Sequence, residues 1–111
     1  MPTRYAKSAI RLAPQNQSPW NYLRGILRHA KRPESSEKPF INEFAVIDKS
    51  DDVRSSHALD MLAEVLAEEE HRKEEAAKAL DLLATKYDPI RANYWNYRKS
   101  LLESAQVQAP A

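Results

Sequence analysis

Acidic and histidine side chains occur in the sequence at spacings that could support metal chemistry. Glu68 and His71, in the stretch "EEEHRKEE", have the Glu-x-x-His spacing that places both side chains on one face of a helix and that carboxylate-bridged di-metal bundles use. Such a centre needs a second copy of the motif and two further carboxylates facing inward, and the sequence has no second copy. The spacing therefore favours a solvated, charged helix end over a metal site.

Candidates for acid–base or nucleophilic catalysis are equally weak. Asp51 and Asp52 are adjacent acids, but their serine- and proline-rich surroundings favour loop solvation or acids at a helix start over a paired general acid and base. His29 and His57 stand alone, and no glycine-flanked serine indicates the nucleophile of a Ser-His-Asp arrangement. We therefore predict no catalytic, cofactor-binding or metal-ligating residue in this chain.

The composition narrows the class of protein. A chain of 111 residues suits one small domain, and its single glycine, Gly25, disfavours tight β-hairpins and phosphate-binding loops, which depend on glycine. Ala, Leu, Glu, Lys and Arg dominate, which favours an all-α fold. The lack of cysteine fits a reducing, cytoplasmic location, and no apolar run is long enough for membrane insertion or a signal peptide.

Charge is distributed unevenly along the chain. Residues 1–33 contain seven Lys or Arg and no acid, whereas residues 34–83 contain fourteen acids and six bases. The early bases recur at helical spacing beside an apolar stripe, so we interpret them as a solvated or internally paired face and predict no nucleic-acid partner. A nucleic-acid binder that uses residues 1–33 remains an alternative.

Apolar periodicity predicts about five helices joined by short connections, which makes neighbouring helices antiparallel hairpins. Ser18 is predicted to cap the second helix, with Pro19 at the first helical position, and Asp88-Pro89 repeats this pattern at the start of the last helix. Within the irregular residues 32–54, "PFINEFAVI" is apolar enough to pack as a short helix. Residues 1–103 form the predicted repeats, and residues 104–111 a disordered tail. The predicted helices cover residues 3–13, 18–31, 55–70, 72–87 and 88–103.

The tripeptide Trp-Asn-Tyr occurs twice, with its two tryptophans, Trp20 and Trp95, 75 residues apart. In each copy a leucine follows seven residues after the tryptophan and so shares its helix face. Ala58 stands about midway, so 75 residues correspond to two periods of about 37, within the range of helix-pair solenoids. The spacing predicts that both tryptophans pack in the core rather than face a ligand, and that the hydroxyls of Tyr22 and Tyr97 need partners.

The flanks of the two copies carry a resemblance to a known family. "LAPQNQSPWNYLRGIL" resembles the repeat of protein prenyltransferase alpha subunits, and "KYDPIRANYWNYRKSLL" resembles the closing segment of the alpha subunit shared by protein farnesyltransferase and type I geranylgeranyltransferase. Leu23, where the family usually has arginine, Ala58 in the middle copy and Asn93 in the last copy depart from the pattern. The residues assigned by resemblance as structural repeat-signature positions are Pro14, Asn16, Ser18, Trp20, Tyr22, Asp88, Pro89, Arg91, Tyr94, Trp95, Tyr97 and Arg98.

The resemblance implies a C-terminal portion of a right-handed superhelix of helical hairpins that wraps around a beta subunit. In such heterodimers the beta subunit holds the catalytic zinc, magnesium is a further cofactor, and farnesyl or geranylgeranyl passes from its diphosphate to a cysteine near the C-terminus of a CaaX protein. No catalytic residue carries over to this chain. Its implied role is a scaffold: helix ends and loops on the concave side contact the beta subunit, and the two tryptophans hold consecutive hairpins together.

Two alternative interpretations of the sequence remain. The chain also fits a free-standing helical-repeat adaptor similar to tetratricopeptide modules, without enzyme activity. A nearer alternative is the alpha subunit of the Rab-specific geranylgeranyltransferase. The ending "YDPIRANYWNY" fits the CaaX type better.

Overall fold

A computed structural model describes the backbone of residues 2–108 and the side chains of residues 3–103. These residues form helices and turns without a strand, so the predicted all-α fold is confirmed. The expected short helix within residues 32–54 is also present, as α3. In chain order the elements are α1 (Pro2–Leu12), α2 (Gln17–His29), η1 (Glu34–Glu37), α3 (Lys38–Ile41), α4 (Ser56–Glu68), α5 (Lys73–Leu82), the π-helical turn η2 (Leu83–Tyr87), the 3-10 turn η3 (Pro89–Arg91) and α6 (Ala92–Gln108).

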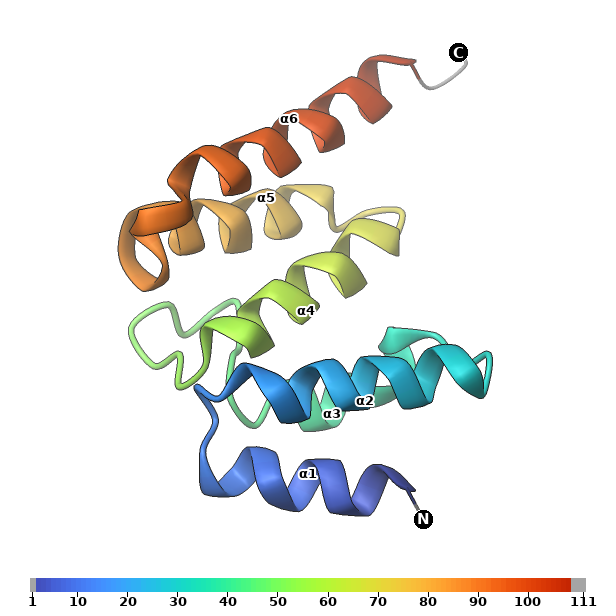
Figure 1. The fold of residues 1–111 in the computed structure, drawn as a ribbon. Helices are drawn as coiled ribbons and strands as arrows, with labels where there is room; N and C mark the ends of the chain where they lie inside the picture. Colours follow the sequence, from blue (N-terminus) through green and yellow to red (C-terminus); the bar gives the residue numbers. More distant parts are fainter. Residues whose placement is uncertain (1, 109–111) are drawn as a thin grey trace.

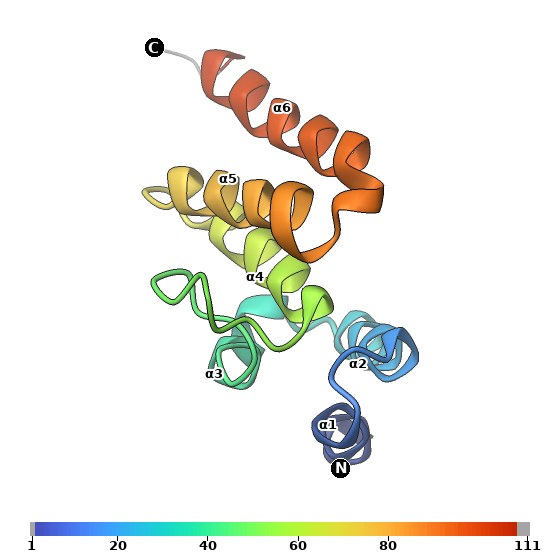
Figure 2. The same ribbon diagram turned by 90° about the vertical axis from the view of Figure 1, so that its left-hand side faces the viewer.

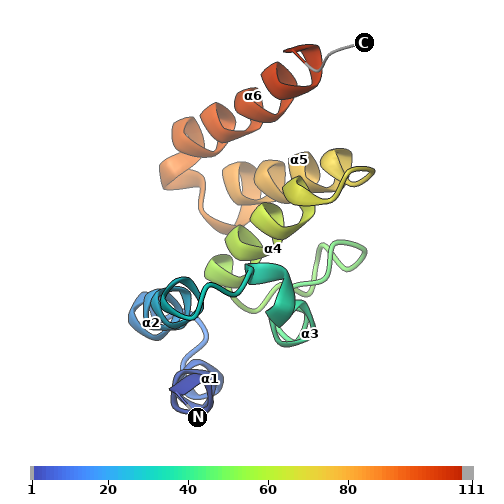
Figure 3. The same ribbon diagram turned by 90° about the vertical axis from the view of Figure 1, so that its right-hand side faces the viewer.

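The helices stack one after another along the longest dimension of the molecule, with the two chain ends at opposite ends of the stack (Figure 1). In that view α2, α4 and α6 run in one direction and α1 and α5 in the other, as antiparallel hairpins require. Turned by 90°, the molecule shows α2 and α3 on opposite sides of the stack (Figures 2 and 3). The three helices that carry the repeat positions are therefore equivalent members of one series.

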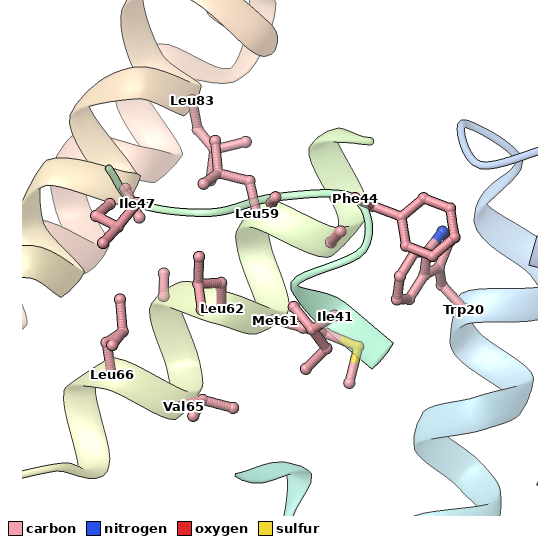
Figure 4. Packing of buried hydrophobic residues seen from close by; sticks show 14 of the residues in the cluster. Trp20, Ile41, Phe44, Ile47, Leu59, Met61, Leu62, Val65, Leu66 and Leu83 are labelled. Carbon is pink, nitrogen blue, oxygen red and sulfur yellow. The ribbon is translucent and has the colours of Figure 1, made fainter. Parts of the chain in front are cut away.

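The core runs through the whole stack, and α4 forms its centre. Seven of the thirteen residues of α4 are buried, because apolar side chains occupy both the face toward α5 and the face toward α2 and α3. Figure 4 shows Leu59, Leu62 and Leu66 of α4 directed into this cluster, with Trp20 beside Phe44 at its other end. The central helix thus contacts hairpins on both sides.

The irregular segment 32–54 is fastened to its neighbours rather than loose. Phe40 and Phe44 pack against Trp20 with ring centroids 5.9 and 5.7 Å away. At the far end of the segment, Tyr87 donates a hydrogen bond to the carbonyl of Ser50, and Lys86 pairs with Asp51 at 2.7 Å. The segment therefore takes the place of the second helix of its hairpin, although only four residues of it are α-helical.

The start of the second helix differs from the prediction. Asn16 caps α2, because its backbone is extended and its Oδ1 accepts a hydrogen bond from the Ser18 N–H at 3.3 Å. Ser18 is consequently the second residue of the helix and Pro19 the third, where the missing N–H costs nothing. The prediction of Ser18 as the cap and Pro19 as the first helical residue was wrong.

The fifth predicted helix also begins and ends differently. Asp88 makes no side-chain cap, and Pro89 opens the 3-10 turn η3 before α6 begins at Ala92. At its other end α6 continues to Gln108, five residues beyond the expected Glu103, because "SAQVQ" contains no glycine or proline to stop it. Residues 109–111 of the expected tail lie outside the described residues, and the division at residue 103 stays a prediction.

Candidate functional site

Three equivalent helix positions hold Trp20, Ala58 and Trp95, and all three side chains are buried. Trp20 lies in α2, Ala58 in α4 and Trp95 in α6, 38 and 37 residues apart. Two residues further along each helix stand Tyr22, Asp60 and Tyr97. The prediction that both tryptophans belong to the core is confirmed, and the middle copy differs from its neighbours at both positions.

The first copy is joined to α4 through the turn at Pro14. The Pro14 carbonyl accepts two hydrogen bonds, from Trp20 Nε1 at 2.8 Å and from Ser55 Oγ at 2.6 Å. Ser55 is also the N-cap of α4, since its Oγ accepts from the Ala58 N–H at 3.2 Å. The neighbouring Gln15 Oε1 accepts from the Ser56 N–H at 3.1 Å. One turn thus orients the indole and fixes the start of the next repeat.

The last copy satisfies its indole locally. Trp95 Nε1 donates to the Asp88 carbonyl at 3.2 Å and to Asp88 Oδ2 at 3.1 Å, and Arg91 Nε donates to the same carboxylate oxygen at 2.8 Å. The ring also contacts Tyr94, with centroids 4.9 Å apart, and the guanidinium of Arg98 lies 5.4 Å from the ring centroid. Asp88 therefore organises the beginning of α6 instead of capping it.

Asp60 joins the first and last copies across α4. Its Oδ2 accepts from Arg24 Nη2 at 3.4 Å, and its Oδ1 accepts from Arg98 Nη1. Burial opposes the charge on Arg98, but the Asp60 carboxylate more than offsets it, so the pKa of the Arg98 guanidinium is raised. Asp60 stands where the outer copies have tyrosine, and it ties α2 to α6 through α4. The sequence analysis did not predict this bridge. Its only signal in the sequence is an acid, Asp60, at the repeat position where the two outer copies have a tyrosine with an arginine one or two residues later.

Tyr22 and Tyr97 project outward. Their side chains are 51% and 60% exposed, and no hydrogen bond from either hydroxyl is present within the described residues. Tyr22 packs edge-to-face with Tyr5, with ring centroids 6.2 Å apart. Tyr94 and Leu101 of α6 are similarly exposed. We call Tyr22, Tyr94 and Tyr97 the exposed aromatic set.

A polar cavity of about 330 Å³ lies between the starts of α4 and α6. Its two acids are already engaged, Asp60 by two arginines and Asp88 by Arg91 and Trp95. The cavity therefore offers shape and hydrogen-bonding groups, but neither of its two acids is free to act as a general acid or base. Its histidine, His57, has Nε2 3.2 Å from the Gln15 carbonyl. Its lining residues include Gln17, Ser56, His57, Asp60, Asp88, Arg91, Tyr94 and Trp95.

The Glu68–His71 pair does not form part of a metal site. Glu68 and His71 are both exposed, and across residues 2–108 no three acidic or histidine side chains are placed to hold a metal ion. The donor set of a zinc or magnesium site is thus not present in this part of the chain. Among the same residues, none of the helices is both long and apolar enough to cross a bilayer.

Comparison with known proteins connects these helices to one family. A family model described as the protein prenyltransferase alpha subunit repeat matches residues 4–30, which are the α1–α2 hairpin with its Pro14 turn. The alpha subunit of protein farnesyltransferase/geranylgeranyltransferase type-1 of Candida albicans is 41% identical over 100 residues, covering 90% of this chain and 32% of that protein. The corresponding subunit of Dictyostelium discoideum is 30% identical over 85% of this chain and 29% of the relative.

A solved structure agrees with the sequence matches. Candida albicans protein geranylgeranyltransferase-I, complexed with GGPP, superposes with a TM-score of 0.84 and 38% identity, covering 90% of this chain and 32% of that one. The chain belongs to the protein prenyltransferase alpha-subunit repeat family. It spans about a third of the length of the relatives that it matches.

Most of the repeat-signature residues of this family occupy defined positions in the helical hairpins. Trp20 and Trp95 are buried, Asn16 caps a helix, and Pro14 and Asp88 accept from the two indoles. Ser18, Pro89, Arg91 and Tyr97 lie on exposed or turn positions of the same hairpins. The structural role assigned to these residues stays a prediction, which the substitutions below test.

Proposed function

We propose that this chain forms part of the alpha subunit of a heterodimeric CaaX protein prenyltransferase, an enzyme that transfers farnesyl or geranylgeranyl from its diphosphate to a cysteine near a protein C-terminus. The structural match to a geranylgeranyltransferase-I over 90% of the chain, at 38% identity, carries the proposal. The resemblance of the ending "YDPIRANYWNY" to the closing segment of such subunits assigns the chain to their C-terminal portion.

Within this proposal the chain is a scaffold for a beta subunit. The exposed aromatic set supports this role, because large aromatic and aliphatic side chains left in solvent on a helical surface are typical anchors of a protein interface. Tyrosine suits such a surface especially, since its ring can be buried while its hydroxyl finds a partner across the interface. The two hydroxyls of Tyr22 and Tyr97 would then bond to the beta subunit.

The chemistry of the proposed enzyme lies outside this chain. Zinc, held by the beta subunit, would activate the cysteine thiol of the substrate, and magnesium would belong to the diphosphate site of the complex. The described residues supply positioning through packed hairpins, and the proposal assigns them no proton transfer or metal ligand. The heterodimer would act in the cytoplasm on CaaX proteins.

Association with a beta subunit tests the proposal. We expect the chain, co-expressed with a tagged CaaX prenyltransferase beta subunit, to copurify with it, and the double substitution Tyr22→Ser and Tyr97→Ser to reduce the recovered chain at least about tenfold, as the loss of two interface anchors should. Lys78→Ala, an exposed change on α5, is the matched control and should leave recovery unchanged. No association, even with further upstream repeats of the family fused to the chain, would favour a free-standing tetratricopeptide-like adaptor.

A further inference from the structure

Three carboxylates share two guanidinium groups between α2, η1, α4 and α6. Arg24 Nη1 lies 2.6 Å from Glu64 Oε1 and 3.6 Å from Glu34 Oε2, while Arg24 Nη2 lies 3.4 Å from Asp60 Oδ2. Arg98 pairs with Asp60 from the other side. These five side chains, which we call the carboxylate cluster, carry one more negative charge than positive charge when all are ionised.

The excess charge falls on Glu34. Its Oε1 is buried without a hydrogen-bond partner. The Glu64 carboxyl shares Arg24 Nη1 with Glu34, and as an anion it can only accept. Glu37, three residues along the same η1 helix, shows the contrast: its carboxylate is 2.7 Å from Lys7 Nζ and 3.4 Å from Arg32 Nη2. A proton on Glu34 would supply the donor that its buried oxygen lacks.

The surroundings of Glu34 offer little further compensation. From α4 it faces Asp60, Glu64 and Glu68, and from α2 it faces Arg24, which Glu64 and Asp60 already engage. Burial, together with the neighbouring carboxylates of Glu64 and Asp60, raises the pKa of Glu34 to about 7, and only Arg24 opposes these effects. The remaining charged groups around the same small cavity are Arg28 and Arg32, and Arg98 lies beyond Asp60.

We propose that Glu34 holds a proton near neutral pH and donates it in a hydrogen bond to Glu64, so that η1 is fastened to α4 by a contact that opens when the proton is lost. The short helix η1 leads directly into α3, whose Phe40 packs on Trp20. Loss of the proton sets two carboxylates against each other at the start of this segment. The device therefore makes the second half of the α2–α3 hairpin sensitive to pH.

The sign of the effect follows from the raised pKa. The folded chain binds the proton more tightly than the unfolded chain, whose Glu34 titrates near the ordinary value. The stability that the protonated contact contributes is fully present below that ordinary value and is lost as the pH rises through about 7. Above this range Glu34 and Glu64 repel each other, and the contact opposes folding.

Unfolding of the full 111-residue chain by urea between pH 5 and pH 8.5 tests the proposal. We expect the ratio of folded to unfolded protein, relative to that of Glu34→Gln, to fall about threefold to tenfold per pH unit between pH 5 and pH 7, because one proton is released. The amide that Glu34→Gln introduces can donate to Glu64 at every pH. The three histidines are present in both proteins, so any contribution from them cancels in this comparison. Glu74→Gln, an exposed acid on α5, is the control and should keep the wild-type dependence. Parallel pH profiles for the wild type and Glu34→Gln would overturn the proposal.

A direct titration keeps the test decisive if the variant fails to fold. The side-chain carboxyl carbons of the wild-type chain can be followed by ¹³C NMR from pH 3 to pH 9. The Glu34 carboxyl signal is identified by its loss from the spectrum of Glu34→Gln or through its backbone assignment. We expect this signal to titrate near pH 7 and the Glu64 signal to shift with it. A Glu34 midpoint in the ordinary range of a solvated glutamate would overturn the proposal.

Discussion

The same tripeptide is built into two different surroundings at the two ends of the molecule. Trp20 is enclosed by Phe40 and Phe44 of the following segment, and its indole donates to a carbonyl that also holds the next repeat. Trp95 lies in α6, which packs on α5; its ring contacts Tyr94 and Arg98, and its indole donates to Asp88 just ahead of the helix. The motif therefore determines which helix face is buried, whereas the neighbouring hairpin determines how much that face contributes to the free energy of unfolding.

Replacing Trp20 should have the largest effect on stability. We expect Trp20→Ala to lower the free energy of unfolding by about 3–5 kcal/mol, because it removes a fully buried aromatic ring and leaves the Ser55 contact to the Pro14 carbonyl unsupported. Urea denaturation followed by circular dichroism measures this change. A loss below about 1 kcal/mol would show that the ring does not hold the hairpins together.

The matching substitution in the last copy should cost less. We expect Trp95→Ala to lower the free energy of unfolding by about 1–2 kcal/mol less than Trp20→Ala does. The aromatic partner of Trp95 is the half-exposed Tyr94, whereas Trp20 packs on the buried Phe40 and Phe44, so the cavity at Trp95 can collapse more easily. The same denaturation experiment provides the comparison. Equal losses for the two tryptophans would contradict the view that the following segment makes the difference.

The bridge across α4 should rank next. Asp60→Asn is expected to lower the free energy of unfolding by about 2 kcal/mol, because it weakens charged hydrogen bonds to two partly buried arginines. The control is Asp81→Asn, whose half-exposed carboxylate pairs with Lys99 and should contribute less than about 0.5 kcal/mol. If both substitutions cost the same, Asp60 is an ordinary surface acid.

The smallest predicted effect concerns the cap that connects the first copy to α4. Ser55→Ala should lower the free energy of unfolding by about 1 kcal/mol, as the loss of a helix cap typically does. Ser100→Ala, which removes an exposed hydroxyl bonded within its own turn of α6, should change stability by less than about 0.5 kcal/mol. A neutral Ser55→Ala would mean that Trp20 alone holds the Pro14 carbonyl in place.

Local signals predicted much of this architecture, and contacts between distant residues account for what they missed. Helical periodicity located every long helix, and the spacing of the tryptophans placed them in the core. Asn16 and Ser18 are both residue types that cap helices, so the sequence alone does not decide between them. The backbone geometry of the folded chain does. The Asp60 bridge joins residues 36 and 38 positions away, so the acid at this repeat position did not by itself identify its two arginine partners.

The shared carbonyl of Pro14 has a consequence for how the molecule unfolds. Its two donors come from the first hairpin and from the beginning of α4, 41 residues from the turn, so opening either repeat releases a hydrogen bond of the other. Stacked repeats with such a shared contact gain an interface energy that makes their unfolding cooperative. The amides of α2 and of the first turn of α4 should therefore exchange with solvent deuterium in a single concerted event rather than one repeat at a time.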